Sequence, residues 1–547
     1  MLTGIWHGHV RRLALLVGIL ALPATNCFAL AINSQAPVLR RPFVFGAYAH
    51  SSVMLPVTAS GRGPFSFSAV RLPAGLFINH STGAITGVTS RAGIYHFRAY
   101  VTNSVGRYSH QFTLMVGNRV ALTPPMGWNS YDYYGDRVNE AQVLINAEYV
   151  HRYLQGSGWN TIVVDYRWYD GNADPEPDNG APGESLSMDQ FGRLIPAADR
   201  FPSAGNGLGF KMLAARIHAM GLRFGIHIMR GIPRLAVEEN LPIAGSRFHA
   251  RDAANVADMC PWCPDMYGVR GDTAAGRAYY LSLFRLYAAW GVDFVKMDDT
   301  SQPYHRDEID AVHEAILHCG RSITLSLSPG ETPIQDAAHV AVHANMWRVS
   351  GDFWDNWPSL NHEFTLARRW QTYVGAGHWP DADMLPLGHL SMGGRPVGRD
   401  RVTNFTQTEQ QMVFSFWSLL PSPLMLGGYL PDLDESTRHM LTNSALIAID
   451  QDSAGYGARL VGKAGATEVW ARALANGQMA VGLFNRSPNT ATVLIRLKTL
   501  GLTTKCTVYD VWRHSHEVEQ ANGELSRTVP SHDAALFIIS PQHKQGK

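Results

Sequence analysis

The 547-residue sequence lacks several features that would assign it to common protein classes. Lys and Arg together number 46 and Asp and Glu number 45, so neither sign of charge is in excess. Because non-specific nucleic-acid binding depends on excess positive charge, this balance predicts no nucleic-acid partner. The five cysteines are too few for a disulfide-stabilised scaffold. The hydrophobic content of 46% is high enough to exclude a mainly disordered chain.

Long hydrophobic runs are also missing. The one apolar run that stands out, Leu13 to Leu22, is too short to cross a bilayer as a helix. Arg11 and Arg12 precede this run, and Pro23 and the small-residue segment Ala29-Leu30-Ala31 follow it. The order is typical of a cleaved secretory signal peptide over residues 1–31. We therefore expect an exported protein, secreted or periplasmic, without a membrane span.

Metal-binding and nucleotide-binding motifs are absent as well. No Walker loop and no zinc-binding spacing occurs, and the pair His339 and His343 lacks the Glu of a zinc-protease motif, which predicts core or surface histidines. Cys260 and Cys263 have redox-motif spacing without the context of a small thioredoxin-like domain. A local loop disulfide or two ordinary thiols remain as the alternatives. We expect no cofactor, and the sequence leaves the oligomeric state open.

The first folded segment, residues 34–118, has an all-β pattern. Stretches rich in β-branched and aromatic residues, such as Tyr95 to Val101 and Gln111 to Val116, are separated by Gly, Asn and Ser turns. Leu72-Pro73-Ala74-Gly75-Leu76, followed by the turn-rich residues 79–87, resembles the corresponding motif of a bacterial immunoglobulin-like module. That resemblance implies a β-sandwich that serves as a spacer or an adhesive appendage.

Between residues 119 and 452, short apolar strands alternate with helix-length segments, a pattern of βα units around a parallel sheet. The expected strands are Met126–Tyr131, Thr161–Trp168, Arg223–Met229, Asp293–Asp299, Ile323–Ser328, Met346–Asp352, a seventh before Asp381, and Pro423–Gly427. Eight strands fit a (β/α)8 TIM barrel, and polar residues at their carboxyl ends favour it over a doubly wound sheet. Residues 453–547 return to short alternating strands, which predict a C-terminal antiparallel β-domain. The predicted fold class is therefore α/β, with a β-domain at each end.

Charged residues gather at the carboxyl ends of the predicted barrel strands. They are Asp165, Asp298, Asp299, Asp352, Asp381 and Asp383, together with Lys296 and Arg348. Carboxylates around one barrel mouth suit glycoside hydrolysis, which needs an ionised and a protonated carboxyl group on either side of an oxocarbenium-like transition state. Lys296 shares a strand face with Asp298, since side chains alternate, and its ammonium would keep Asp298 ionised.

Four segments in this region resemble the motifs of glycoside hydrolase family 27, the α-galactosidases. They are Thr123-Pro124-Pro125-Met126-Gly127-Trp128-Asn129-Ser130, Lys296-Met297-Asp298, Arg348-Val349-Ser350-Gly351-Asp352, and Trp379-Pro380-Asp381-Ala382-Asp383-Met384-Leu385. They occur in the family's order on predicted strands 1, 4, 6 and 7. The family's C-terminal β-domain also fits the residues after 453.

This resemblance implies roles for individual residues. Asp298 would be the nucleophile and Asp352 the general acid/base of a retaining α-galactosidase, with the two carboxyl groups about 5 to 5.5 Å apart. Lys296, Arg348 and Asp383 would contact sugar hydroxyls, and Asp165 would be the first of two adjacent acids that bind the galactose 4- and 6-hydroxyls. The substrate would be a terminal α-D-galactosyl group of an oligo- or polysaccharide. No metal is implied.

Several positions depart from the family pattern. Tyr166 replaces the second of the adjacent acids, Tyr131 replaces a Trp in the first-strand motif, and Met297 replaces the aromatic of the nucleophile motif. His227 stands where many members have Tyr, and Thr300 replaces a Cys, so the usual disulfide at that point cannot form.

These departures affect which sugar is recognised and leave the catalytic pair unchanged. In addition, residues Ser326 to Gly330 do not match the loop by which animal members of the family distinguish galactose from N-acetylgalactosamine. A β-L-arabinopyranosidase, an isomalto-dextranase and a non-catalytic carbohydrate-binding protein therefore remain as alternatives. Trp128, Trp168 and Trp262 are candidate pocket walls, with ordinary barrel packing as the alternative for each.

Overall fold

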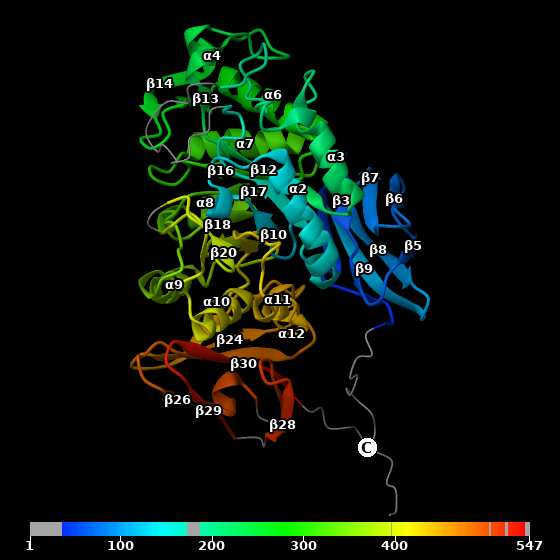
Figure 1. The fold of residues 1–547 in the computed structure, drawn as a ribbon, viewed down its shortest axis with the longest axis vertical. Helices are drawn as coiled ribbons and strands as arrows, with labels where there is room; N and C mark the ends of the chain where they lie inside the picture. Colours follow the sequence, from blue (N-terminus) through cyan, green and yellow to red (C-terminus); the bar gives the residue numbers. More distant parts are fainter. Residues whose placement is uncertain (1–34, 172–185, 395–396, 503–504, 520–522, 542–547) are drawn as a thin grey trace, which may run out of the picture.

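The computed structural model describes residues 35–171, 186–394, 397–502, 505–519 and 523–541. The signal peptide expected at residues 1–31 lies outside the described residues. Figure 1 shows an N-terminal β-sandwich in blue beside a central barrel, with a C-terminal sheet in orange and red at the far end of the molecule. The predicted fold class is thus confirmed: an α/β barrel with an immunoglobulin-like β-unit before it and an antiparallel β-domain after it.

The N-terminal unit consists of two packed sheets. One sheet has the order β2-β9-β8-β5, and the other has the order β3-β7-β6. Their bounds are β2 (Val44–Tyr48), β3 (Ser52–Pro56), β5 (Ser66–Val70), β6 (Leu76–Ile78), β7 (Ala84–Val88), β8 (Gly93–Thr102) and β9 (Arg107–Gly117), with a small pair β1 (Val38–Leu39) and β4 (Ala59–Ser60) beside them. Along β8, Phe97, Ala99 and Val101 are buried in alternation with more exposed neighbours. This two-residue period places one face of the strand in the sandwich core.

The sandwich is joined to the barrel at the end of the barrel opposite to the predicted site. The Ser52 amide donates to the Gly320 carbonyl over 2.9 Å, and the Ser322 amide donates to the Ser52 carbonyl over 2.9 Å. Gly320 and Ser322 precede the fifth barrel strand, so these bonds hold β3 against the amino ends of the strands. Because barrel enzymes build their sites at the carboxyl ends, the sandwich does not line the predicted site.

The central domain contains eight parallel strands in the order β19-β18-β17-β16-β12-β11-β10-β22. They are β10 (Met126–Asn129), β11 (Thr161–Val164), β12 (Arg223–Met229), β16 (Phe294–Asp298), β17 (Thr324–Leu327), β18 (Met346–Arg348), β19 (Trp379–Asp381) and β22 (Leu424–Leu426). Leu385, just after β19, forms a parallel bridge with Leu426 of β22, and this contact closes the ring. Each strand lies within or close to its predicted range, and several end earlier because their last predicted residues turn into the loops of the site.

Helices surround the barrel. The main ones are α2 (Glu140–Tyr149), α3 (Lys211–Ala219), α6 (Ala274–Trp290), α7 (Arg306–His318), α8 (Ala337–His343), α9 (Trp357–Trp370) and α10 (Gln407–Leu419). Their starts are set by local sequence, since Thr273 caps α6 through the Gly276 amide and Thr406 forms a capping box with Glu409 at α10. None of the described helices is both long and apolar enough to cross a membrane.

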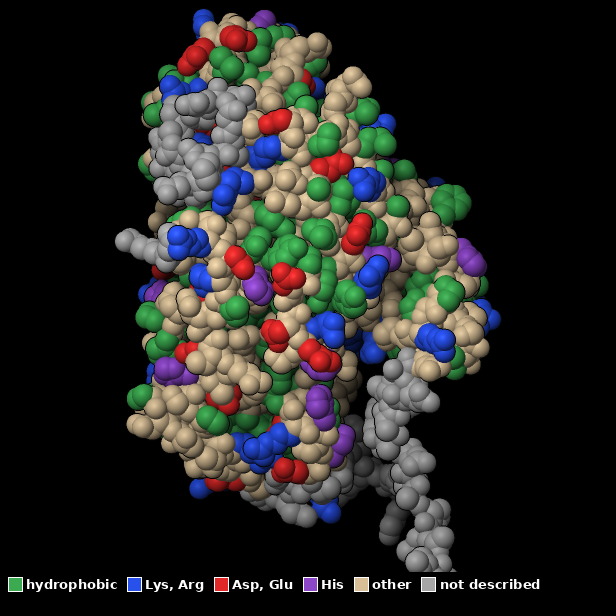
Figure 2. Space-filling model, in the orientation of Figure 1, with side chains coloured by type: hydrophobic (Ala, Val, Ile, Leu, Met, Phe, Trp, Pro, Cys, Tyr) green, Lys and Arg blue, Asp and Glu red, His purple; other side chains and the backbone are tan. Residues whose placement is uncertain are grey.

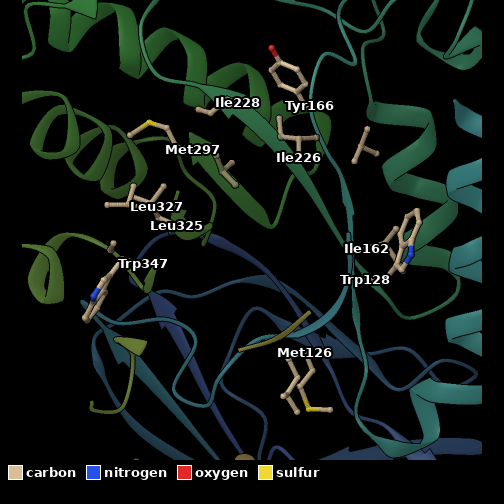
Figure 3. Close-up of a cluster of buried hydrophobic side chains, with 14 of the residues drawn as sticks. Met126, Trp128, Ile162, Tyr166, Ile226, Ile228, Met297, Leu325, Leu327 and Trp347 are labelled. Carbon is tan, nitrogen blue, oxygen red and sulfur yellow. The ribbon is translucent and has the colours of Figure 1, made fainter. Parts of the chain in front are cut away.

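Apolar side chains of the strands fill two separate layers, the inside of the barrel and the space between the strands and the helices. The inner cluster consists of Val163, Phe294, Met346, Trp379 and Met425. Trp128, Ile162, Ile226, Met297 and Trp347 are among the buried residues shown in Figure 3. These five side chains belong to the outer layer, between the strands and the helices, because they alternate along their strands with inward-facing residues such as Asn129 and Lys296. Charged side chains of both signs are intermixed on the face of the molecule shown in Figure 2.

The C-terminal domain is an antiparallel sheet of order β23-β24-β25-β30-β27-β28 with a second pair, β26 and β29. The bounds are β23 (Arg459–Ala464), β24 (Thr467–Ala473), β25 (Met479–Asn485), β26 (Ala491–Arg496), β27 (Cys506–Asp510), β28 (Ser515–Glu519), β29 (Glu524–Val529) and β30 (Asp533–Pro541). It packs on α10, where Phe416 lies 5.5 Å from the Trp470 ring and 5.2 Å from the Phe484 ring. Glu468 of β24 also pairs with Arg368 of α9 at 2.8 Å.

Candidate active site

A pocket of about 320 Å³ opens at the carboxyl ends of the barrel strands. Its lining residues are Tyr131, Asp132, Asp165, Tyr166, Trp262, Lys296, Asp298, Ser328, Pro329, Gly330, Arg348, Gly351, Asp352, Phe353, Trp354, Asp383 and Met384. The strand ends β10, β11, β16, β17, β18 and β19 all contribute. Eight of the nine predicted site residues line this one pocket, and Trp128 is the exception.

Asp165 lies one residue beyond β11 and is almost completely buried. Its Oδ2 accepts a hydrogen bond from Asn129 at 2.5 Å and one from the Lys296 ammonium at 3.1 Å. Burial by itself would raise the pKa of Asp165, but the positive charge of Lys296 outweighs it and the pKa is lowered. Asp165 is therefore held as a carboxylate, the form that accepts hydrogen bonds from ligand hydroxyls.

Asp298 is the last residue of β16. Its Oδ2 lies 3.1 Å from Nε2 of His227, and its Oδ1 lies 4.0 Å from Nζ of Lys296. Burial opposes the charged form, but Lys296 and His227 together hold the pKa of Asp298 below its ordinary value. A carboxylate that stays ionised and has one oxygen without a hydrogen-bond partner is suited to attack an electrophilic carbon.

Lys296 lies between these two carboxylates. Its side chain points to the pocket because side chains alternate along β16, which puts Lys296 and Asp298 on the same face. Burial would lower the pKa of Lys296, but Asp165 and Asp298 raise it, so the ammonium remains charged. Its Nζ also lies 5.9 Å from the centre of the Tyr131 ring, a cation–π distance.

On the other side of the pocket, Arg348 joins two acids. Its Nη2 lies 2.7 Å from Oδ2 of Asp383 and 3.1 Å from Oδ1 of Asp352. Asp383 has a φ of +79°, a left-handed backbone conformation, and its carboxylate accepts the amides of Phe353 and Met384 at 2.8 and 2.7 Å. The guanidinium is thus fixed by Asp383 and in turn orients Asp352.

Asp352 differs from the other pocket acids because its side chain is 61% exposed. It follows β18 by four residues and stands at the open rim, where it contacts Arg348. At this rim the carboxyl group is open to water and to the departing group of a bound glycoside, the position that a general acid/base needs. The pocket therefore holds one enclosed carboxylate, Asp298, and one rim carboxyl, Asp352.

Tyr166 forms the wall next to Asp165. Its ring is edge-on to His227 at 5.5 Å and lies 6.1 Å from the ring of Trp262. Burial is the main cause that raises the pKa of Tyr166, so the phenol stays neutral. An uncharged aromatic surface thus stands at the position where the family pattern has its second acid.

For two of the three candidate tryptophans, the structure shows the alternative, ordinary barrel packing. Trp128 is fully buried, and its indole N–H donates to the Gly428 carbonyl at 2.8 Å away from the pocket. The alternation along β10 explains this, because Asn129 faces Asp165 and the neighbouring Trp128 must face the opposite way. Trp168 is also fully buried and bonds to the His227 carbonyl at 2.6 Å. Of the three candidates, Trp262 alone lines the pocket.

Two of the predicted strand-end acids do not line the pocket. Asp299 has a φ of +64° and pairs with Arg230 at 2.8 Å, and Asp381 is buried beside the Asp383 amide. Conversely, Asp132 and Trp354 line the pocket although sequence reasoning did not single them out. Asp132 directly follows Tyr131 at the end of the first-strand motif, and this position could have identified it as a site residue. No sequence pattern identifies Trp354.

The cysteines of the Cys260 to Cys263 segment are both buried and unbridged. Of the two alternatives, the disulfide is therefore not formed in this structure. Cys263 lies within 3.5 Å of a carboxylate oxygen of Asp265, and burial raises the pKa of both thiols. The loop between them carries Trp262 into the pocket wall.

Comparison with known proteins matches each part of the chain to a family. Residues 269–452 match the family described as Alpha galactosidase A, residues 464–539 match the Alpha galactosidase C-terminal beta sandwich domain, and residues 36–117 match the "Putative Ig domain". An alpha-galactosidase of Coffea arabica is 30% identical over 81% of this chain and 100% of its own length.

Solved structures extend this relation. A GH27 β-L-arabinopyranosidase from Geobacillus stearothermophilus is 45% identical over 78% of this chain and 98% of that chain, with a TM-score of 0.74. Its D197A variant in complex with arabinose is 44% identical over 77% of this chain, with a TM-score of 0.73. With the motifs, the barrel and the C-terminal domain in agreement, this chain belongs to glycoside hydrolase family 27 and is a glycoside hydrolase.

Proposed function

We propose that the protein is a retaining exo-glycosidase that removes terminal β-L-arabinopyranosyl groups in preference to α-D-galactosyl groups. The observation that carries this proposal is Tyr166, a neutral aromatic wall at the position of the acid that, in the family pattern, helps bind the galactose 4- and 6-hydroxyls. The two sugars share the configuration at C1 to C4, and β-L-arabinopyranose lacks only the hydroxymethyl group at C5. A site without the second acid therefore loses no 6-hydroxyl contact with the pentose.

Asp298 and Asp352 would perform a double displacement. The Asp298 carboxylate attacks the anomeric carbon and forms a glycosyl ester, while the carboxyl group of Asp352 donates its proton to the departing oxygen. Asp352 then takes a proton from water, which attacks the same carbon and frees Asp298 with the original configuration restored. Lys296 keeps Asp298 ionised at the start of the cycle, and the open rim gives Asp352 access to water.

The remaining polar groups would bind the sugar hydroxyls. Asp165 and Lys296 form one pair and Arg348 and Asp383 the other, on opposite sides of the pocket. A volume of about 320 Å³ suits a single pyranose ring with part of the next group. Terminal residues of an oligo- or polysaccharide are therefore the expected substrates.

An α-galactosidase is the second candidate. Asp165, the first acid of the family pattern, is present and ionised, and the curated relatives include alpha-galactosidases at 28–30% identity. The structural relative at 45% identity that acts on β-L-arabinopyranosides favours the first proposal over this one.

The test compares kcat/KM for p-nitrophenyl β-L-arabinopyranoside, α-D-galactopyranoside and α-D-glucopyranoside. We expect the arabinoside to be best, and we expect Tyr166→Asp to raise the ratio of galactoside to arabinoside turnover, with Tyr166→Phe as the matched control. A higher kcat/KM for the galactoside in the unmodified enzyme would establish the second candidate. Preferred cleavage of the glucoside would point to a dextran-type substrate and overturn both.

The catalytic assignment is tested separately. Asp298→Asn should abolish turnover of all these glycosides, and a fluorinated glycosyl inhibitor should label Asp298. For Asp352→Ala, added azide should restore turnover and yield a glycosyl azide of retained configuration. Labelling at any other carboxylate would contradict the role of Asp298.

We also propose that the protein is exported, on the basis of the signal-peptide pattern in residues 1–31. Expression of the full chain in a Gram-negative host followed by amino-terminal sequencing of the periplasmic product tests this. A mature protein that still carries Met1 in the cytoplasm would contradict it.

A further inference from the structure

A cluster of histidines lies outside the pocket, between two helices of the outer ring. Asp310 belongs to α7, and His339 and His343 lie one turn apart on the same face of α8. Helix α7 follows β16, which carries Asp298, and α8 precedes β18, which carries Arg348 (Figure 1). The cluster thus joins two helices that flank strands of the active site.

The possible ligand atoms are already close together. Nε2 of His339 lies 2.6 Å and Nε2 of His343 lies 3.4 Å from the same oxygen of Asp310, and all three atoms lie within 4.8 Å of one another. Bonds of about 2.0–2.2 Å in a tetrahedral centre place neighbouring ligand atoms roughly 3.4 Å apart. Small side-chain movements are enough to reach that arrangement.

The hydrogen bonds of His343 leave a lone pair that faces a carboxylate. Its Nδ1 lies 2.8 Å from the His339 carbonyl oxygen, and because a carbonyl can only accept, this nitrogen carries a proton. In the neutral ring, Nε2 is then an acceptor that faces another acceptor, Asp310 Oδ1. Two acceptors at 3.4 Å call for a cation between them, either a proton on Nε2 or a metal ion.

The surroundings of His339 are those of a metal-ligating histidine. Its Nδ1 lies 2.6 Å from the Tyr304 hydroxyl, and its Nε2 is hydrogen-bonded to Oδ1 of Asp310 at 2.6 Å. If the proton moves to Nδ1 and is donated to Tyr304, an ion can take the place of the Nε2 proton between His339 and Asp310. Neutral imidazole is the form that binds metals.

One other cluster of possible metal ligands occurs among the described residues, but a cation of the protein already lies within it. Asp258, His305 and Glu308 also lie close together, but Arg230 occupies their centre, at 2.8 Å from Asp258 and 2.7 Å from Glu308. That cluster already contains its cation. In the cluster of Asp310, His339 and His343, the two histidines are the only groups of the described part of the chain within salt-bridge distance of Asp310.

We propose that Asp310, His339 and His343 form a binding site for a divalent transition-metal ion, Zn²⁺ in the first instance, that ties α7 to α8. Two imidazole nitrogens and one carboxylate suit Zn²⁺ and its neighbours, whereas Mg²⁺ and Ca²⁺ prefer oxygen ligands throughout. The Asp310 side chain is 47% and that of His343 24% exposed, so water completes the coordination. The site is separate from the hydrolytic pocket, and the reaction at Asp298 does not need it.

The experiment uses the full chain without a polyhistidine tag, stripped of metal with a chelator and then titrated with ZnCl₂ by calorimetry. We expect one equivalent per chain at this site, an upward shift of Tm on binding, and visible d–d absorption when Co²⁺ replaces Zn²⁺. His339→Ala, His343→Ala and Asp310→Asn should each lose that equivalent and the Co²⁺ absorption. His318→Ala, an exposed histidine of the same helix α7, is the matched control and should retain both.

A further variant tests the outer contact. Tyr304→Phe leaves the three ligands in place but removes the hydroxyl partner of His339, and we expect Zn²⁺ binding to weaken by roughly 10–100-fold. The absence of stoichiometric Zn²⁺ binding would overturn the proposal. So would binding that persists unchanged in His339→Ala and His343→Ala, since the ion would then be held elsewhere, for example by Cys260 and Cys263.

Discussion

Replacement of Lys296 by Met removes the positive charge that lies between the two buried pocket carboxylates. Its ammonium is 3.1 Å from Asp165 and 4.0 Å from Asp298. Two unit charges 4 Å apart interact by about 4 kcal/mol at an effective dielectric constant of 20. This corresponds to roughly a thousandfold change in the acid dissociation constant of Asp298, because about 1.4 kcal/mol is a factor of ten. His227 at 3.1 Å remains as a smaller source of stabilisation for the carboxylate.

The assay is the pH dependence of kcat/KM with a p-nitrophenyl glycoside. In the unmodified enzyme, the pKa of Asp298 lies so low that the acid limb falls outside the usual range. In Lys296→Met, we expect this limb to appear above about pH 4, because the free enzyme must hold Asp298 ionised. Lys296→Arg keeps the charge and should leave the limb low, and the exposed Lys211→Met is a second control. A Lys296→Met enzyme that loses activity by the same factor at every pH would refute the reasoning, since Lys296 would then be a sugar contact alone.

Three further predictions concern stability. Trp128→Phe leaves the Gly428 carbonyl without its hydrogen-bond donor and should lower the free energy of unfolding by about 1–3 kcal/mol, measured in urea. KM should not change, because Trp128 does not line the pocket. A raised KM would show that Trp128 contacts the substrate. Glu468→Gln removes the buried charge that pairs with Arg368 and Arg486 and should lower the free energy of unfolding by about 3–5 kcal/mol. As a control, Glu435→Gln breaks an exposed ion pair and should lower it by less than about 1 kcal/mol. Burial and, to a smaller extent, the negative charge of Asp383 raise the pKa of Asp381 to about 7. Between about pH 4 and 7 the folded protein therefore binds more protons than the unfolded protein, and its free energy of unfolding falls as the pH rises through that range. Asp381→Asn keeps an oxygen for the Asp383 amide and should reduce this slope in urea unfolding at a series of pH values; an unchanged slope would contradict it.

The barrel strands were predictable because they are short apolar runs bounded by polar residues, and each run has the local composition of a buried parallel strand. The same local argument placed Lys296 and Asp298 on one face of one strand, where the structure has them. The motif alone suggested Trp128 as a pocket residue, but alternation along β10 turns it away from the side on which Asn129 meets Asp165. A motif gives the order of residues, whereas the direction of each side chain depends on the register of the strand.

By itself, the sequence determined the three-part organisation, the barrel, and the set of acids that could serve the chemistry, because strand periodicity and family motifs are local properties of the chain. Tertiary structure alone decided which acids line the pocket. Asp299 pairs with Arg230 and Asp381 is buried beside Asp383, whereas Asp132 is part of the pocket lining. Tertiary structure also decided that Asp298 is enclosed beside Lys296 and His227 while Asp352 stands in solvent at the rim. Electrostatic environment depends on distances between residues far apart in the chain, such as Asp165 and Lys296 or Asp310 and His339, and closure of the barrel and its helix ring sets those distances.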